Sequence, residues 1–196
     1  MAKRLFDLLG AALALLLLSP LLALVALAIQ LDSSGPVFFR QQRVGRHGVL
    51  FHIHKFRTMQ ADAPGPQITV AHDHRITRVG NVLRHYRLDE LPQFIDVLGG
   101  AMSLVGPRPE VPRFVAHYPA EMRARVLAVR PGITDPASLA HLDEITLLAG
   151  AADPERAYIE IILPAKLALQ ADYAERATLG SDLAVLGRTL WVLVSH

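Results

Sequence analysis

The chain contains no cysteine. It therefore cannot be a small secreted fold held together by disulfides, and its composition is compatible with a reducing compartment. It also has no internal repeat, and 196 residues fit a single domain with an adequate hydrophobic core. These absences bound the class of protein without identifying its function.

Acidic side chains are scarce in one part of the chain. From Arg40 to Arg87 there are nine Lys and Arg residues but only two acids, Asp62 and Asp73. From Leu88 onward nine basic residues face fourteen acids, so the formal net charge of +2 hides a strong asymmetry. The basic segment is where we expect an anion or an acidic lipid surface to bind.

Charged residues are missing altogether from Leu8–Leu31, a run of 24 residues. A straight helix of that length spans roughly 36 Å, enough to cross a hydrocarbon core of about 30 Å. Three arrangements fit this run. The first is a cleaved signal peptide, although the run is longer than the apolar region of a typical signal peptide. The second is a spanning helix, and the third is a helix that enters the membrane and turns back.

Two features bear on that choice. Basic residues flank the run on both sides, among them Lys3 before it and Arg40 after it, so the positive-inside rule draws both flanks to the same face. Ser19 and Pro20 lie at the middle, where proline breaks the helical hydrogen bonds and serine can satisfy the freed groups. We favour the re-entrant helix by a narrow margin, since many spanning helices also carry a proline.

A β-hairpin is predicted after the apolar run. Val37 opens the first strand, Gly45–Gly48 forms the turn, and Val49–Phe56 returns as the second strand. Side-chain alternation places Lys55 and Arg57 on one face, and a basic pair of this kind suits a phosphate. A solvated hairpin face would carry the same two residues.

The segment after the hairpin leads toward an acidic pair. Gln60–His74, with its Pro-Gly-Pro centre, is expected to be a polar loop that acts as a lid or as plain surface. A short helix over Asn81–Tyr86 then brings Arg84 and Arg87 just ahead of the acids. Cations this close are expected to hold the pKa values of both acids down and keep them ionised.

The acidic pair is Asp89 and Glu90, at the centre of Arg84–Gly100. Pro92 is tolerated only in the first turn of a helix, so we expect a helix to begin near Asp89 and to end at the following glycine pair. Its first turn would present the two carboxylates about 100° apart, as an asymmetric pair at the positive end of the helix dipole. The alternative is that both acids merely cap the helix. The expected apolar face consists of Leu91, Phe94, Ile95 and Leu98.

Two stiff turns follow, and each presents an arginine. Arg108 stands between two prolines after a glycine, and Arg130 precedes Pro131. Proline fixes its own backbone and restricts the residue before it. Such a turn is often only a turn. Two of them, a basic strand face and an acidic helix start together suit a diphosphate with a divalent cation between it and the carboxylates.

The last quarter of the chain is expected to be helical. Asp153 and Pro154 open one helix to about Leu163, Pro164–Arg176 forms a second, and a third, capped by Ser181-Asp182, runs to Val194. The third helix contains Trp191 and few charges. It either packs the core, contacts another subunit or lies in the membrane interface.

Several motifs follow one another in order along the chain. They are KRLFD at Lys3–Asp7, Ser19-Pro20, GPVFFRQQRVG at Gly35–Gly45, KFRTM at Lys55–Met59, RITRVGNVLR at Arg75–Arg84, LDELPQ at Leu88–Gln93, MSLVGPRP at Met102–Pro109 and RPGIT at Arg130–Thr134. Over nearly its whole length the chain thereby resembles the small monotopic polyprenyl-phosphate phosphoglycosyl transferases of the bacterial sugar transferase family.

The resemblance implies a fold and a location. The fold is α+β, with a re-entrant helix-break-helix membrane hairpin over residues 1–34, broken at Ser19-Pro20. A catalytic domain over residues 35–196 would hold a small β-hairpin and several short or amphipathic helices. The protein would sit on the bacterial inner membrane with its active site on the cytoplasmic face.

The resemblance also implies an activity. A phosphosugar would move from a nucleotide diphosphate sugar, usually a UDP-sugar, to undecaprenyl phosphate in a Mg²⁺-dependent reaction that releases UMP. This is the first membrane step of glycoconjugate assembly, and downstream glycosyltransferases would use the product. Partners would include the phospholipid membrane and not nucleic acid, and a homodimer is compatible with the family.

The family's functional residues can be carried over by motif. Asp89 matches the nucleophile, which forms a covalent phosphosugar intermediate, and Glu90 matches its partner, tied to the metal and the second half-reaction. An ionised aspartate at a helix start is a competent phosphoryl acceptor when Mg²⁺ and arginines neutralise the phosphates. Phosphate or nucleotide contacts are expected from Lys55, Arg57, Arg84, Arg108 and Arg130.

Two positions depart from the common pattern. Asp96 stands where such relatives often have asparagine, and Asp135-Pro136 follows one branch of the family, with an expected bearing on the choice of sugar. The alternative to an enzyme is a membrane-attached protein that only binds anions or nucleic acid. Against nucleic acid, the aromatic residues of the basic segment are not interleaved with its cations as stacking platforms would be.

Overall fold

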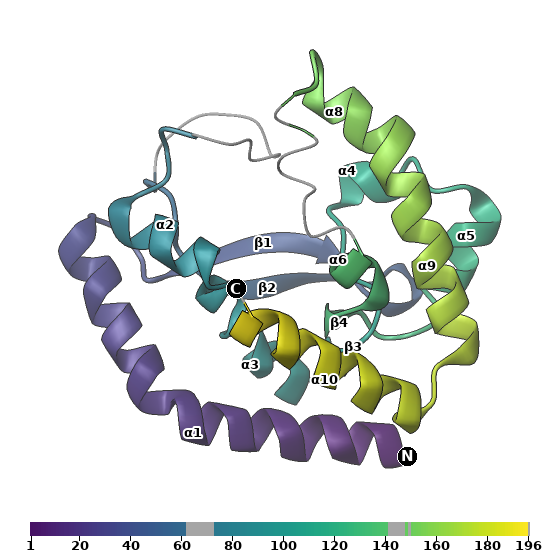
Figure 1. The fold of residues 1–196 in the computed structure, drawn as a ribbon, viewed down its shortest axis with the longest axis horizontal. Coiled ribbons are helices and arrows are strands. Elements are labelled where there is room, and N and C mark those ends of the chain that lie inside the picture. Colours follow the sequence, from purple (N-terminus) through teal and green to yellow (C-terminus); the bar gives the residue numbers. More distant parts are fainter. Residues whose placement is uncertain (62–72, 141–147, 149, 196) are drawn as a thin grey trace.

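The computed structural model describes residues 1–61, 73–140, 148 and 150–195. Most of the predicted loop Gln60–His74 lies outside these residues. The fold mixes helices and strands, as expected, and the strands form two small sheets (Figure 1). Its elements are α1 Ala2–Asp32, β1 Phe38–Val44, η1 Arg46–Gly48, β2 Leu50–Phe56, α2 Arg78–His85, η2 Leu88–Glu90, α3 Gln93–Leu98, β3 Ser103–Val105, α4 Pro112–Val115, α5 Ala120–Val126, β4 Gly132–Thr134, α6 Pro136–Ala140, α8 Pro154–Ala157, η3 Tyr158–Ile162, α9 Leu163–Arg176 and α10 Leu179–Ser195.

The apolar run forms α1, one helix that bends sharply near its middle (Figure 1). Pro20 lies inside the helix, where it removes a backbone hydrogen bond and clashes with the preceding turn. The hydroxyl of Ser19 donates to the carbonyl of Leu16 at 2.8 Å. The predicted break at this point is therefore a bend within a continuous helix.

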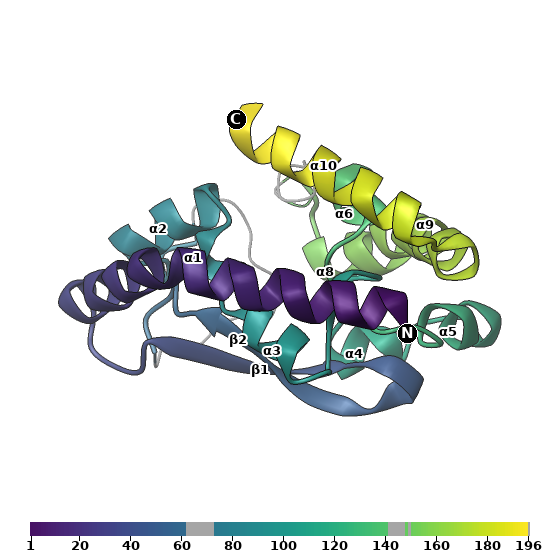
Figure 2. The ribbon, with the colours of Figure 1, turned by 90° about the horizontal axis from the view of Figure 1, so that it is seen from below.

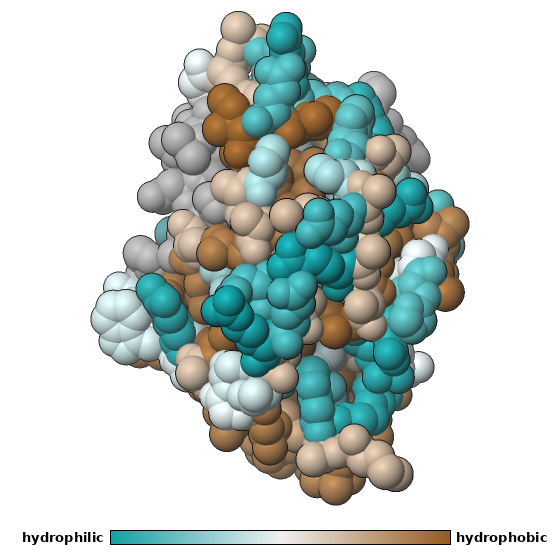
Figure 3. All heavy atoms as spheres, turned by 90° about the vertical axis from the view of Figure 1, so that its right-hand side faces the viewer, coloured by the Kyte–Doolittle hydropathy of each residue, from teal (hydrophilic) through white to brown (hydrophobic). Residues whose placement is uncertain are grey.

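Most of the apolar surface of α1 has no protein against it. Leu9, Leu16, Leu17 and Leu24 are each more than half exposed. Viewed from its side, the molecule carries hydrophobic residues along the lower edge, where Figure 1 places α1 (Figure 3). The helix has the length and hydropathy of a membrane-inserted segment, and only 11% of its most apolar stretch is buried inside the protein.

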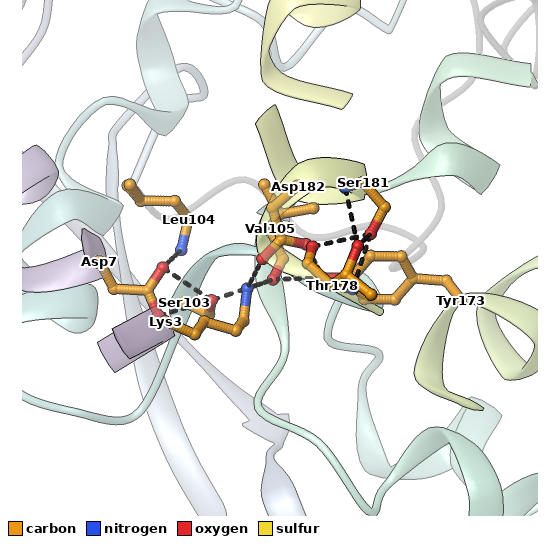
Figure 4. A network of polar contacts seen from close by, with 9 residues as sticks. All are labelled: Lys3, Asp7, Ser103, Leu104, Val105, Tyr173, Thr178, Ser181 and Asp182. Carbon is orange, nitrogen blue, oxygen red and sulfur yellow. Dashed lines mark hydrogen bonds and ion pairs between the residues drawn. The ribbon is translucent and has the colours of Figure 1, made fainter. Parts of the chain in front are cut away.

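Both ends of α1 are fastened to the rest of the chain. At the first end the Asp7 carboxylate accepts hydrogen bonds from the hydroxyl of Ser103 and the backbone N–H of Leu104, while Lys3 pairs with Asp182 at 2.5 Å (Figure 4). At the other end Asp32 accepts a hydrogen bond from the backbone of Val79, in α2, at 3.1 Å.

The hairpin forms where the sequence predicts it. β1 and β2 are antiparallel, and their register places Phe39 opposite Lys55 and Arg43 opposite Phe51. The turn at Arg46–Gly48 uses a left-handed backbone at His47, with φ of 57°. Figure 2 shows the hairpin on one side of α1 and α10 on the other.

β3 and β4 form a second sheet of two parallel strands. The backbone segments next to these strands are in contact, because a Cβ at Gly132 would lie 2.1 Å from the backbone nitrogen of Gly106. A Cβ at Gly106 would in turn lie 2.3 Å from the carbonyl oxygen of Arg130. Only glycine fits at either position, so the two stiff turns of the sequence are packed against each other.

Three helix predictions around the acidic pair need correction. α2 begins at Arg78, because the hydroxyl of Thr77 caps it by accepting from the N–H of Gly80. The acids lie in the 3₁₀ turn η2, and α3 begins only at Gln93. The inward face of α3 consists of Gln93, Asp96 and Val97, whereas Ile95 and Leu98, expected inside, are 41% and 38% exposed.

The C-terminal helices also differ from the prediction. Asp153 does cap α8, but the helix continues through the π-helical turn η3 into α9, so the predicted first and second helices are one (Figure 1). This π turn lies just before Pro164, which has no N–H to donate to the preceding turn. α10 is capped by reciprocal hydrogen bonds between Thr178 and Ser181, and Asp182 is fully buried.

Candidate active site

A cavity of about 710 Å³ lies between the hairpin, α2, η2 and the loop that follows β3. Its wall brings together charged residues from segments far apart in the sequence. They include Arg43, Lys55, Arg84, Asp89, Glu90 and Arg108. The cavity therefore holds both acids of the LDE motif and most of the cations that the sequence predicts for phosphate binding.

Glu90 is held between two cations. Lys55 Nζ donates to Glu90 Oε1 at 2.6 Å. The guanidinium of Arg108 forks onto the same carboxylate, with Nη1 3.0 Å from Oε2 and Nη2 donating to Oε1. Burial acts to raise the pKa of Glu90, but the charges and hydrogen bonds of Arg108 and Lys55 hold it well below its ordinary value.

The pKa of Asp89 is shifted in the opposite direction from that of Glu90. Burial, and then the charge of Glu90, raise the pKa of Asp89, while Lys55 and Arg84 act in the opposite direction. The pKa of Glu90 is therefore lowered as expected, but by Arg108 and Lys55 in place of the expected Arg84 and Arg87, and the expectation is wrong for Asp89. In the part of the chain that the structure describes, nothing donates a hydrogen bond to the Asp89 carboxylate. The two acids form an asymmetric pair, one clamped and one available.

Lys55 lies in β2 and Arg57 directly follows it, and the two side chains have different partners. Lys55 turns to Glu90, and burial lowers the pKa of its ammonium while Glu90 opposes that shift. Arg57 is only 4% exposed, and its guanidinium donates to the backbone carbonyls of Ser33 and Ser34. Arg57 thus holds the segment that leaves α1, and because it also lines the cavity, its phosphate contact stays a prediction.

The two arginines of the stiff turns also have different positions. Arg108 reaches the cavity, whereas Arg130 is absent from its lining and donates through Nε to the carbonyl of Gly100 at 2.9 Å. The predicted phosphate contact of Arg130 is therefore not supported by its position. It holds the glycine turn that ends α3.

The residues just before the acids are held in an unusual backbone. Arg84 lines the cavity from α2, and its charge acts on Asp89 as predicted. Arg87 has φ of 55°, in the left-handed region that costs an L-residue roughly 1 kcal/mol. This conformation turns the chain from α2 into η2, which directs Asp89 and Glu90 into the cavity.

Arg43 is a cavity residue that the sequence reasoning missed. It donates to the carbonyl of Pro109 at 3.0 Å and to the side chain of Gln41 at 2.6 Å, and its buried Nε has no hydrogen-bond partner among the described residues. Alternation along β1 could have indicated it. Phe39 pairs with Lys55 across the hairpin, so Phe39, Gln41 and Arg43 lie on the same face of the sheet as Lys55.

The arrangement suits chemistry on phosphates. Two carboxylates with pKa values shifted in opposite directions lie beside at least three cations in a partly enclosed cavity. Lys55 and Arg108 keep N–H donors beyond those that bind Glu90, since an ammonium has three and a guanidinium five. Among the described residues, no group of three or more His, Asp or Glu side chains forms a metal cage.

Comparison with known proteins places the chain in a family. A UDP-glucose:undecaprenyl-phosphate glucose-1-phosphate transferase of Caulobacter vibrioides is 41% identical over 193 residues, which are 96% of this chain and 68% of that protein. A UDP-N-acetylgalactosamine-undecaprenyl-phosphate N-acetylgalactosaminephosphotransferase of Aeromonas hydrophila is 46% identical over 71% of this chain. An Escherichia coli enzyme with the same name as the Caulobacter one is 47% identical over 67% of the chain.

The extent of these matches differs. The chain spans about a third of the Aeromonas protein and 29% of the Escherichia coli protein, so these relatives are much longer. The model of the bacterial sugar transferase family, in contrast, matches residues 1–196. With the full-length family match and the acidic pair, cations and glycine-dependent turns assembled around one cavity, the chain belongs to the bacterial sugar transferase family.

Proposed function

We propose that this protein transfers a phosphosugar from a UDP-sugar to undecaprenyl phosphate and releases UMP. The observation that carries the proposal is the pairing of an available carboxylate, Asp89, with a clamped one, Glu90, in a cavity lined by cations. The names of the Caulobacter and Aeromonas relatives describe the same transfer with glucose and with N-acetylgalactosamine.

Asp89 is the nucleophile in this proposal. An oxygen of its carboxylate bonds to the phosphorus that carries the sugar, the bond from that phosphorus to the bridging oxygen breaks, and UMP leaves with the bridging oxygen. A phosphate oxygen of undecaprenyl phosphate then attacks the same phosphorus and frees Asp89. One carboxylate thereby serves a water-soluble donor first and a lipid acceptor second.

The neighbouring charges prepare this reaction. Glu90 holds Lys55 and Arg108 side by side, and their remaining N–H donors can bind the oxygens of the diphosphate. The charge of Arg84, which lines the cavity from α2, favours the ionised form of Asp89. Positioning and neutralisation of phosphate charge account for most of the catalysis of phosphoryl transfer.

Mg²⁺ belongs to the proposal as the cofactor. It prefers one or two carboxylates together with phosphate oxygens, and the donor set here fits that preference. Asp89 would hold it, with Glu90 beside it, because the oxygens of Glu90 already bind two cations and those of Asp89 accept no hydrogen bond from the described residues. When bound, the ion would neutralise charge on the diphosphate.

We also propose the re-entrant arrangement of α1, with residues 1–34 as anchor and residues 35–196 as catalytic domain. Support comes from the two ends of the helix, since Asp7 and Asp32 are both hydrogen-bonded to the same globular part. A helix held at both ends on one side, bent at Pro20 and exposing leucines, fits insertion into one face of the membrane. We place that face at the cytoplasmic side of the bacterial inner membrane.

The test is UMP release by detergent-solubilised protein. A panel of UDP-sugars that includes UDP-glucose and UDP-N-acetylgalactosamine is assayed with Mg²⁺ or with a chelator, and with or without undecaprenyl phosphate. We expect sustained release only with the lipid and Mg²⁺ present. Release that neither the lipid nor the chelator affects would contradict the proposal. The sugar that supports release would make the product on which the next glycosyltransferase acts.

A further inference from the structure

Asp135 is a fully buried carboxylate outside the cavity, and it binds three separate parts of the fold. Its Oδ2 accepts the backbone N–H of Arg108 at 3.0 Å and the side-chain amide of Gln170, in α9, at 2.7 Å. Its Oδ1 accepts the backbone N–H of Ser138 at 2.6 Å, so it also caps α6. Of these three bonds, one holds a residue of the active site.

The small parallel sheet brings Asp135 and Arg108 together. β3 leads into Gly106 and on to Arg108, while β4 leads directly into Asp135. Parallel strands end at the same edge of a sheet, and the N–H of Gly106 donates to the carbonyl of Thr134 at 3.1 Å across that edge. The two chains therefore leave the sheet side by side.

The backbone of the Arg108 loop is attached through one N–H, in addition to the carbonyls of Pro107 and Pro109, which accept from the N–H of Gly132 and from Arg43. Pro107 and Pro109 have no N–H, so the N–H of Arg108 is the one backbone donor of this tripeptide. That donor goes to Asp135. At the other end of the same residue, the guanidinium forks onto Glu90, a geometry that tolerates little displacement.

We propose that Asp135 is a positioning residue for the transfer reaction: it fixes the backbone of Arg108 so that the guanidinium stays in register with Glu90. It touches neither the cavity nor substrate and acts through Arg108. The effect on turnover rests on the proposed function, whereas the effect on the Arg108 backbone does not. This gives a physical role to the Asp-Pro that follows the RPGIT motif.

An exchange of two side chains separates this role from general support of the fold. In the Asp135→Asn, Gln170→Glu protein, the new amide can donate to the new carboxylate and its oxygen can still cap Ser138. The N–H of Arg108 then faces an amide NH₂ group and has no acceptor. In Asp135→Asn alone, the amide can turn so that its oxygen serves Arg108 and Gln170, and only the cap of α6 is lost.

The two variants should therefore differ in turnover. Each leaves one buried N–H without an acceptor, so both should melt below the parent, but we expect only the exchange to lower UMP turnover, about tenfold or more. Hydrogen–deuterium exchange should become faster in a peptide that covers Arg108 but not in one that covers Ser138. Asp135→Asn alone should melt at a lower temperature and keep turnover within about twofold of the parent.

The Arg108→Lys background supplies the second readout. If Asp135 acts through Arg108, the side-chain exchange should lower turnover much less in that background than in the parent. Ser138→Ala is the matched control, because it keeps the backbone N–H and removes a hydroxyl that has no partner in the described structure. It should leave turnover and hydrogen exchange unchanged.

Two results would overturn the inference. One is an exchanged protein with full turnover and a protected Arg108 segment, which would make Asp135 a support of the fold alone. The other is an equal loss of turnover in the parent and Arg108→Lys backgrounds. A parent chain that releases no UMP from any donor would instead count against the proposed function, while faster exchange at Arg108 in the exchanged protein would still support the positioning role.

Discussion

Asp96 and His54 form a two-point clasp between α3 and β2. Asp96 Oδ2 accepts the backbone N–H of His54 at 2.8 Å, and Oδ1 lies 2.6 Å from His54 Nδ1. Asp96 is buried, and neither residue is part of the cavity lining. The clasp fixes α3, which follows the acidic pair, against the strand that supplies Lys55.

We expect Asp96→Asn to be tolerated. The amide oxygen can still accept the backbone N–H of His54, and the imidazole can change tautomer so that Nδ1 accepts from the amide. Asp96→Leu should lower the free energy of unfolding by about 2 kcal/mol, because a buried N–H is then left without an acceptor. Thermal unfolding in detergent and UMP turnover are measured on both variants. A large loss of turnover in Asp96→Asn would mean that the charge itself is needed.

Asp89→Asn should abolish transfer without affecting the fold. The amide is a poor nucleophile, so we expect turnover to fall about 10³-fold or more while membrane attachment and melting temperature stay unchanged. Mass spectrometry of the parent after incubation with the donor, without undecaprenyl phosphate, should detect a sugar phosphate on the peptide that contains Asp89. Glu90→Gln is the comparison, because it loosens the clamp on Lys55 and Arg108 but leaves Asp89 in place. An adduct on a peptide without Asp89 would assign the nucleophile elsewhere.

Replacement by Met should affect mainly stability at Arg57 and mainly turnover at Lys55. Arg57→Met removes two buried hydrogen bonds to Ser33 and Ser34, so we expect a loss of stability of about 3 kcal/mol. The protein that remains folded should keep the parent's KM for the UDP-sugar. Lys55→Met should lower turnover about 100-fold with a smaller change in melting temperature, because it removes a cation from the cavity. A changed KM in Arg57→Met would restore the phosphate contact that the sequence predicts.

The absence of native cysteine makes the arrangement of α1 directly measurable. Single cysteines are introduced as Ala2→Cys, Leu17→Cys and Ser34→Cys, and bacterial spheroplasts are treated with a membrane-impermeant maleimide before and after lysis. A re-entrant α1 predicts that Ala2→Cys and Ser34→Cys react only after lysis. Leu17→Cys, beside the bend and 68% exposed in the protein itself, should stay protected by lipid in both conditions. Reaction of one end before lysis and of the other only after it would indicate a spanning helix.

Local signals were sufficient for some parts of the fold. Alternation and the Gly45–Gly48 turn predict the hairpin, and two prolines predict the presentation of Arg108 to the cavity. β3 and β4 are only three residues long, too short for periodicity to reveal them, although the RPGIT and SLVG segments that contain them were recognised as motifs. The capping of α10 was misplaced by three residues because Asp182 looks like a cap and instead pairs with Lys3, 179 residues earlier.

For the site, the sequence predicts which types of residue line it but not which side chains bind one another. Lys55 and Arg108 were expected to bind phosphate, but nothing local shows that both converge on Glu90. Arg57 and Arg130 lie in motifs as strong as those of Lys55 and Arg108, yet each donates to backbone carbonyls and not to Glu90. Which partner a long cation meets depends on contacts between distant segments, and these are a property of the folded chain.

The bend in α1 makes the membrane part of the mechanics of the site. The first half of the helix is fixed through Asp7 to β3, which leads to Arg108, and the second half through Asp32 to α2, which leads to Asp89. In that arrangement, a change of the bend angle at Pro20 would move these two segments relative to each other. In the proposed arrangement, the lateral pressure and thickness of a single leaflet bear on that angle. The membrane lipid would then influence the distance between the acids and Arg108, in addition to surrounding α1 and supplying the acceptor.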